Sequence, residues 1–273
     1  MNQNKLIIDA NSSPFALNLK ELFRYRDLFW VLAMRDFKVR YAQTFLGFLW
    51  AFIQPLATLI VLTFVFGKAV KVDTGGVPYP LFALSGMVAW TYFAFVMSQS
   101  GNSIIGAQEM VKKIYFPRLV IPLSKAIVGF VDLGITFLFM VTLMIFYEFV
   151  PSVNMIYLPF FLIMAVMAAL SVGIWLSALT IRYRDFQHVV PFMVQFGLYA
   201  TPIAYPASAF PEKYQWVMHL NPMAGVVEGF RWSILGGNPP SNYMYLSFVL
   251  VILLVFSALF YFKKVEKVMA DIV

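Results

Sequence analysis

The sequence predicts an all-α polytopic membrane protein with six transmembrane helices, an N-terminal amphipathic interfacial helix, outer re-entrant short helices between spans five and six, and both termini in the cytoplasm. Of its 273 residues, 61% are hydrophobic and 12% are charged, whereas soluble globular proteins have about 45–50% and about 25%. A soluble fold cannot bury so much apolar surface. The composition therefore excludes soluble enzymes and disordered chains, and the lack of Cys excludes disulfides and thiolate metal sites.

The six transmembrane helices are predicted from apolar runs of about 20 residues, which cross a hydrocarbon core of about 30 Å as helices. The runs are Thr44–Phe66, Tyr79–Ser98, Leu119–Tyr147, Tyr157–Ile181, His188–Pro206 and Tyr243–Phe262. Pro55 in run one and Pro191 and Pro202 in run five predict kinked or broken helices. We treat residues 1–273 as one transmembrane domain, with an N-terminal helix at 15–43, spans one to five at 44–206, an outer region at 207–242, and span six with a tail at 243–273.

The basic residues predict the orientation of the bundle. Fifteen of the twenty Lys and Arg residues precede span one, lie between spans two and three or four and five, or follow span six, and four fall on the opposite side. Cytoplasmic loops carry an excess of Lys and Arg, so both termini are expected in the cytoplasm. The net charge of +7 therefore serves topology and contact with anionic membrane lipids, and no nucleic-acid partner is expected.

The segment Phe15–Tyr41 is predicted to form the amphipathic helix after the start signal Ser12-Ser13-Pro14. Its charged residues fall near one face and its apolar residues near the other, namely Leu19, Leu22, Phe23, Phe29, Trp30, Ala33, Phe37 and Tyr41. A basic amphipathic helix with Trp and Phe on its apolar face lies in the membrane interface. A plain lipid-surface anchor with no further role explains the same pattern.

The region Ala207–Asn242 between spans five and six is too long for a turn and too apolar for a flexible loop. Prolines divide it, and Glu212–Leu220 and Met223–Leu235 are each long enough for a short helix. We expect these helices to dip back into the bilayer or to cover a pore mouth. Two interfacial helices that only cap the bundle are the alternative.

Sequence motifs for catalysis are absent. The chain has no phosphate-binding Gly-x-x-x-x-Gly-Lys-[Ser/Thr] loop, no His-Glu-x-x-His helix and no Gly-x-Ser-x-Gly turn, so we expect neither an ATP site nor enzyme activity, and no metal. Asp132 is the one acidic residue deep in a span, and intramembrane charges are by default functional candidates. Lys125 is two turns away, about 10.5 Å along the helix, too far for a direct pair. We expect Asp132 to be a buried hydrogen-bonding residue rather than part of a proton relay.

Small residues recur in span four at a spacing of four, which places them on one helix face: Ala165, Ala169, Gly173 and Ser177. Such stripes let a second helix approach closely in lipid, either within one chain or between two. The pair Gly225 and Gly229 is a further case outside a clear span.

The segment between spans two and three is predicted to contain one short helix, Ile104–Ile114, which Pro117 terminates. Ile105, Gln108, Glu109 and Lys112 fall on one side of that helix. An interfacial loop explains the lysines alone, whereas a protein contact also explains the mixture of apolar and acidic residues.

Three ordered motifs stand at the start of span one, after span four and before span six. They are Arg35-Asp36-Phe37-Lys38-Val39-Arg40-Tyr41 with Leu46-Gly47-x-x-Trp50 and Gln54-Pro55, then Arg182-Tyr183-Arg184-Asp185, then Leu220-Asn221-Pro222. Together they resemble the ABC type-2 permeases that export polysaccharides, above all the O-antigen, capsule and teichoic-acid export permeases. The order of the helices agrees with that family over nearly the whole chain.

The resemblance implies a permease subunit of an ATP-driven exporter in the bacterial cytoplasmic (inner) membrane. It implies a homodimer with two copies of a cytoplasmic ATPase, which binds ATP and Mg in place of any cofactor in this chain, and a lipid-diphosphate-linked polysaccharide as substrate. The helix between spans two and three then couples to the ATPase through Ile105, Gln108, Glu109, Lys112 and Lys113. The N-terminal helix becomes a gate helix that contacts the diphosphate with Arg35, Asp36, Lys38 and Arg40. The outer helices become an external gate with Trp216, Asn221, Pro222, Glu228 and Arg231.

A sugar chain needs a path without strong binding sites, and aromatic rings stack on the apolar faces of sugars. The candidates for lining this path are Tyr92, Phe196, Tyr199 and Tyr205, although lipid-facing or interface aromatics give the same pattern. Two other functions remain: an ABC type-2 exporter of a small lipid or drug, and a proton-coupled transporter or intramembrane transferase. The last class needs a chain of buried ionisable residues, which Asp132 alone does not supply.

Overall fold

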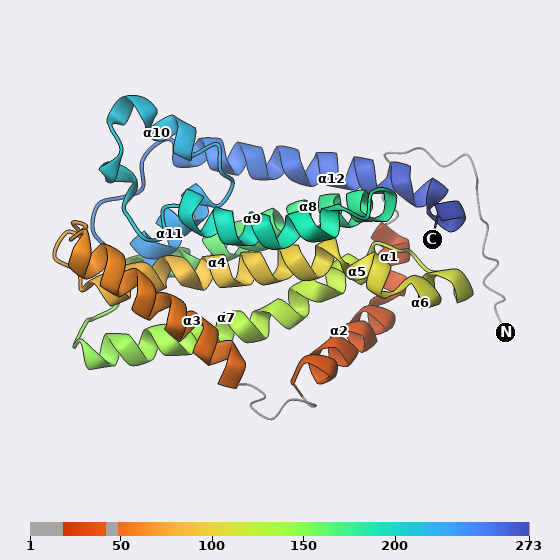
Figure 1. Cartoon of the computed structure of the whole chain (residues 1–273), viewed down its shortest axis with the longest axis horizontal. Coiled ribbons are helices and arrows are strands. Elements are labelled where there is room, and N and C mark those ends of the chain that lie inside the picture. Colours follow the sequence, from red (N-terminus) through yellow and green to blue (C-terminus); the bar gives the residue numbers. More distant parts are fainter. Residues whose placement is uncertain (1–18, 42–48, 273) are drawn as a thin grey trace.

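The computed structural model describes residues 19–41 and 49–272, and the regular elements in these ranges are helical. The helices are α1 Leu19–Arg24, α2 Arg26–Tyr41, α3 Leu49–Leu62, α4 Tyr79–Gly101, α5 Ser103–Gly106, α6 Gln108–Lys113, α7 Val120–Phe146, α8 Leu158–Arg182, α9 Phe186–Ala200, α10 Glu212–Met218, α11 Ala224–Leu235 and α12 Met244–Ile272. The long helices run along the length of the molecule, with α1, α5 and α6 at one end and α10 and α11 toward the other (Figure 1).

Within the described ranges, five helical segments are long and apolar enough to cross a membrane: Leu49–Ala69, Tyr79–Gly101, Val120–Phe146, Val153–Arg182 and Met244–Lys267. They correspond to predicted spans one to four and six. Predicted span five overlaps α9, which begins two residues earlier and whose 15 residues extend for about 22 Å at 1.5 Å per residue. This helix ends because Thr201 is extended, since the following Pro202 disfavours helical backbone in the residue before it.

The central helix is α4, because 78% of its span is buried, compared with 22–39% in the other four spans. It packs against α7, α8 and α11. Glycines permit this approach: an added Cβ would lie 2.6 Å from Val96 at Gly129 of α7, and 2.6 Å from Ser100 at Gly173 of α8. Gly173 belongs to the small-residue stripe of span four, whose other members are also buried: Ala165, Ala169 and Ser177. The stripe therefore lies inside the chain, with Gly173 against α4.

The N-terminal segment is not the single helix that was predicted. Within its described part, α1 and α2 are separated at Tyr25, and α2 packs against α7. On the predicted apolar face, Ala33 and Tyr41 are buried, whereas Phe23 is 70% exposed and Trp30 is 54% exposed and therefore open to lipid. Leu32, which was not assigned to that face, is buried in a cluster with the start of α7. Packing on α7, rather than one amphipathic face, decides which side chains are buried. Residues 15–18 and 42–43 of the predicted segment lie outside the described ranges.

The predicted single helix Ile104–Ile114 is also wrong, because α5 and α6 are separate helices with Ala107 between them. Gly106 is a weak helix former. The amide of Ala107 donates to the carbonyl of Ile104 at 3.0 Å, a three-residue spacing that tightens the last turn of α5. The chain therefore changes direction before Gln108.

The two short helices predicted within residues 207–242 lie close to where they were expected, but they differ in burial. α10 is mainly exposed, whereas α11 packs against α4, α8 and α12. Its buried side chains include Val226, Val227, Phe230 and Ile234. Gly229 is essential to this position, because an added Cβ would lie 2.0 Å from the ring of Phe161 in α8.

Candidate functional site

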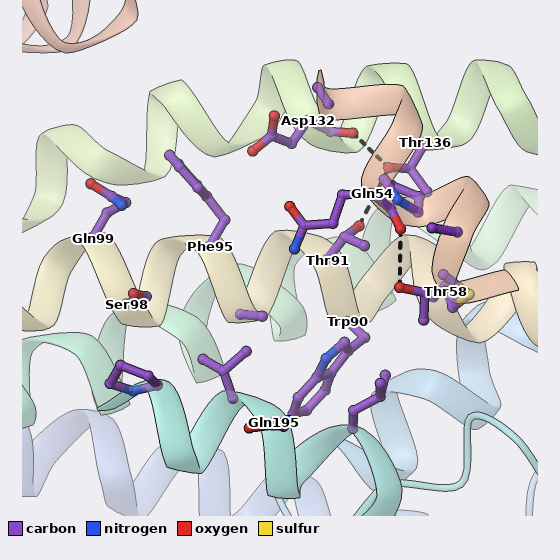
Figure 2. Close-up of a pocket in the computed structure, with 18 of the residues that line it drawn as sticks. Gln54, Thr58, Trp90, Thr91, Phe95, Ser98, Gln99, Asp132, Thr136 and Gln195 are labelled. Carbon is purple, nitrogen blue, oxygen red and sulfur yellow. Dashed lines mark hydrogen bonds between the residues drawn. The ribbon is translucent and has the colours of Figure 1, made fainter. Parts of the chain in front are cut away.

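A cavity of about 1020 Å³ lies among α2, α3, α4, α7 and α9. Seven uncharged polar residues line it: Gln54, Thr58, Thr91, Ser98, Gln99, Thr136 and Gln195. Figure 2 shows Phe95 and Gln99 pointing from α4 toward α7, and Trp90 pointing from α4 toward α9. Most of these residues belong to apolar helices, so the cavity brings polar groups into the part of the molecule where lipid is the solvent.

The threonine hydroxyl groups in the cavity donate to backbone carbonyls of the helices that carry them. Thr58 donates to the carbonyl of Gln54 at 3.0 Å, and Thr136 donates to the carbonyl of Asp132 at 2.9 Å. Among the described residues, by contrast, no hydrogen bond involves the side-chain amides of Gln54, Gln99 or Gln195. Each amide has two N–H donors and an oxygen acceptor. The three amides can therefore bind a ligand rich in hydroxyl groups.

The predicted channel aromatics mostly lie elsewhere, and only Tyr199 lines the cavity. Tyr92 is completely buried between α4 and α7, where its ring lies 5.1 Å from that of Phe130 and its hydroxyl donates to the carbonyl of Ala126. Phe196 is 62% exposed on α9. Tyr205 donates from its hydroxyl to the carbonyl of Tyr199 at 2.8 Å, outside the cavity.

Trp90 and Phe95 are the aromatic residues of the cavity wall that the sequence analysis missed. Trp90 packs closely on α9, since an added Cβ on Gly197 would lie 2.5 Å from its ring. The helical spacing of Trp90, Ala94 and Ser98, which share one face of α4 and all line the cavity, is the signal that could have identified this wall. This spacing was hard to recognise in the sequence because the other faces of α4 are also mostly apolar.

The end of the cavity nearest α2 is charged. Asp36 pairs with Lys125, and Asp132 pairs with Arg40 at 2.8 Å from Nη1 to Oδ2. Tyr41 also donates to Asp132, at 2.6 Å. Asp132 is thus a buried hydrogen-bonding residue, as expected, but its partners come from α2.

The four residues predicted to contact a diphosphate lie on α2 close to this end. Arg35 pairs with Asp36 at 2.8 Å, Arg40 is held by Asp132, and Lys38 is exposed. The charged residues that line this end are two cations, Lys125 and Arg40, and two carboxylates, Asp36 and Asp132, each held in an ion pair. Arg35 and Lys38 lie beside them on α2, outside the cavity lining.

The residues predicted to form an external gate come together only in part. Asn221 lies three residues before α11, where its side-chain oxygen accepts from the amide of Met223 at 2.9 Å and its amide donates to Thr201 at 2.8 Å. Pro222 follows it, two residues before α11 begins. Arg231 donates to the carbonyls of Pro202 at 2.9 Å and Ile203 at 3.0 Å. Trp216, on α10, is 46% exposed.

Glu228 holds a buried histidine that the sequence analysis had not assigned. The Nε2 atom of His219 lies 3.1 Å from a carboxylate oxygen of Glu228, and Nδ1 lies 2.9 Å from the carbonyl of Gln215. Burial lowers the pKa of His219, but the hydrogen bonds to Glu228 and Gln215 and the charge of Glu228 outweigh it. The pKa of His219 is therefore raised above its usual value of 6.5.

The residues predicted to couple to an ATPase lie at the end of the molecule that carries α1. Glu109, Lys112 and Lys113 are exposed on α6, where Glu109 and Lys113 form an ion pair at 3.1 Å. Ile105 and Gln108 are partly buried, so the break at Ala107 leaves α6 as the polar and accessible part of this segment.

Comparison with known proteins decides the family. A model of the ABC-2 type transporter family matches residues 27–235. This chain belongs to the ABC-2 type transporter family. It is 31% identical over 258 residues to the O-antigen export system permease protein RfbA of Klebsiella pneumoniae, with 93% of this chain and 97% of that protein covered. The Myxococcus xanthus protein of that name is 26% identical (78% and 82% covered), and the polysialic acid transport protein KpsM of Escherichia coli is 25% identical (76% and 80% covered).

Family membership makes the chain a membrane-embedded permease subunit. Its long apolar helices agree with a multi-pass protein of the bacterial inner membrane.

Proposed function

We propose that the chain is the permease subunit of an ATP-driven exporter that moves a lipid-diphosphate-linked polysaccharide across the bacterial inner membrane. The observation that carries this proposal is the cavity, which combines three side-chain amides free of partners in the described structure with two cations, Lys125 and Arg40, at one end. Hydroxyl-rich sugars need hydrogen-bonding groups inside the membrane, and a diphosphate needs cations. Relatives named as O-antigen export permeases support the same substrate class.

The proposed assembly is a homodimer that binds two copies of a cytoplasmic ATPase, which supplies the ATP and Mg site. An exposed apolar strip on α9, with Phe192 and Phe196 stacked at 5.9 Å, supports a contact with a second copy beside the cavity. In this arrangement α9 and the chain that follows it form a short span five. Both termini then lie in the cytoplasm, with α10 and α11 as the outer re-entrant region.

We place the ATPase at α5 and α6. The exposed Glu109, Lys112 and Lys113 give this surface both charges, which favours a specific protein contact over simple lipid attraction. Ile105 and Gln108 connect it to the bundle. In the same assembly, α2 acts as the gate helix, with Arg35, Lys38 and Arg40 close to the diphosphate.

The experiment that tests this function is transport in proteoliposomes that contain the chain and its ATPase. We expect movement of a lipid-diphosphate-linked oligosaccharide that requires ATP hydrolysis. Changing Gln54, Gln99 or Gln195 to Leu should each reduce the rate roughly two- to tenfold, since one hydrogen bond contributes about 0.5–1.5 kcal/mol. The control is Gln187→Leu, the same change on α9 but outside the cavity. Transport of a small lipid or drug, with none of the glycan, would contradict the proposal and favour the alternative exporter.

A further inference from the structure

The charged end of the cavity contains two ion pairs of opposite direction between α2 and α7, here called the α2–α7 ion pairs. In one, α2 supplies the anion Asp36 and α7 the cation Lys125; in the other, α2 supplies the cation Arg40 and α7 the anion Asp132. All four side chains line the cavity. A ligand in the cavity can therefore reach both pairs.

Because the two ion pairs place their charges in opposite order on α2 and α7, they favour a single axial position of α2 along α7. Asp36 and Arg40 are one turn apart on α2. Sliding α2 by one turn would bring Arg40 toward Lys125, or Asp36 toward Asp132, and like charges repel. An arrangement that penalises the shifted registers specifies the observed one. The α2–α7 ion pairs therefore position the gate helix.

Each carboxylate also has a second partner on α2. Asp36 is held by Arg35 at 2.8 Å, and Asp132 accepts from the hydroxyl of Tyr41 at 2.6 Å. Removing one member of a buried pair is strongly destabilising when the other charge is left alone. Here Lys125 and Arg40 can change partners while both carboxylates keep one, Asp36 within α2 and Asp132 through the single bond from Tyr41 that still joins α2 to α7. The structure thus permits an exchange in which an incoming anion takes the cations.

Arg40 is placed for such an exchange. Its guanidinium lies 4.1 Å from the ring centroid of Phe95, which projects from α4 into the cavity (Figure 2). Contact with a ring face stabilises a cation without using its N–H donors. Arg40 can therefore bind an anion while it stays at the cavity wall.

We propose that a diphosphate group in the cavity takes Lys125 and Arg40 from Asp36 and Asp132, and that this exchange removes both ion pairs between the helices, so that α2 swings away from α7 about the Tyr41–Asp132 hydrogen bond that remains. The proposal rests on the proposed function for the presence of the diphosphate. Arginine binds phosphate oxygens in a bidentate manner and lysine binds them as a point charge, so the two cations together suit a diphosphate. Release of α2 would open one wall of the cavity only when a substrate head group is present.

Thiol reactivity of the complex with its ATPase tests the proposal. The chain contains no Cys, so an introduced Cys is its single thiol. Ala33 on α2 is 2% exposed and Val31 is 60% exposed. We expect farnesyl diphosphate, added to the complex in phosphatidylcholine nanodiscs, to raise the maleimide reaction rate of Ala33→Cys about tenfold. The matched control Val31→Cys should react rapidly with or without the diphosphate.

Two further arms separate ion exchange from other causes. In the background of Asp36→Leu with Lys125→Met, apolar packing replaces one ion pair, a change that is often neutral for stability. We expect the thiol of Ala33→Cys to stay protected there and not to respond to the diphosphate. We also expect no response when phosphatidylglycerol replaces part of the phosphatidylcholine.

A full response in the Asp36→Leu, Lys125→Met background would overturn the exchange, and an equal response to phosphatidylglycerol would overturn the diphosphate assignment. If the complex exports lipid-linked glycan while Ala33→Cys never responds, this inference fails and the proposed function stands. If the complex exports no glycan, the proposed function itself fails.

Discussion

Replacing Gly229 by Ala should destabilise the protein by forcing α11 away from α8. The added Cβ would lie 2.0–2.5 Å from three ring atoms of Phe161, whereas carbon atoms in contact are about 3.5–4.0 Å apart. The ring cannot move freely, because Phe161 is 3% exposed and packs against Trp232 and Phe248. α11 must therefore shift, and with it Glu228.

The magnitude follows from two opposing effects. Overpacking costs about 1–3 kcal/mol, and Ala stabilises a helix by about 1 kcal/mol relative to Gly. With a clash this severe, we expect a net loss of about 1–2 kcal/mol, which lowers the melting temperature by roughly 2–8 °C. The assay is thermal unfolding of the purified protein in detergent.

The matched control is Gly134→Ala in α7, because no atom lies within 4 Å of the added Cβ there. This variant should melt at the same temperature as the unchanged protein or slightly above it. If Gly229→Ala also melts no lower than the unchanged protein, α11 is not packed on α8 in the way described here.

Three other predictions concern the outer region and the coupling segment. Because the pKa of His219 is raised, protonation of this residue stabilises the fold below about pH 6.5, and the stabilisation is lost as the pH rises through the raised pKa. Glu228→Gln should flatten this part of the profile of melting temperature against pH. An unchanged profile would rule out the pair of His219 and Glu228. Arg231→Met should cost about 1–3 kcal/mol, because two backbone carbonyls lose a charged donor, and a melting temperature equal to that of the unchanged protein would contradict this. Changing both Glu109 and Lys112 to Ala should leave ATP hydrolysis in place while transport falls, and unaltered transport would refute the coupling role.

The sequence predicted the long spans closely where lipid alone decides the structure. Predicted spans Leu119–Tyr147 and Tyr157–Ile181 differ by one residue at each end from α7 and α8. The agreement is close because a helix that crosses the hydrocarbon core must be apolar over its whole length in the membrane. The short α9 shows the limit of this reasoning. Hydropathy alone extends this helix to Pro206, whereas it ends at Ala200, next to the break that Pro202 predicted.

The candidate site was less predictable, because it depends on contacts between distant segments. Tyr41 and Asp132 are 91 residues apart, and nothing in either helix alone indicates their contact. Tyr92 looked suitable for a sugar path by residue type, but its position on α4 directs it into the core. Gln54 and Gln195 did carry a usable signal, since each is an uncharged polar residue inside a predicted apolar span.

The central claim, that glycan passes through the cavity among α2, α3, α4, α7 and α9, can be tested by photo-crosslinking during transport. Benzoylphenylalanine placed at Gln195 or Gln99 should capture the lipid-linked glycan, and only when ATP is hydrolysed. The control position is Leu138 on α7, which is 66% exposed and does not line the cavity. Capture at the two cavity positions and not at Leu138 is the predicted result. Active transport with capture at Leu138 and none in the cavity would contradict the account.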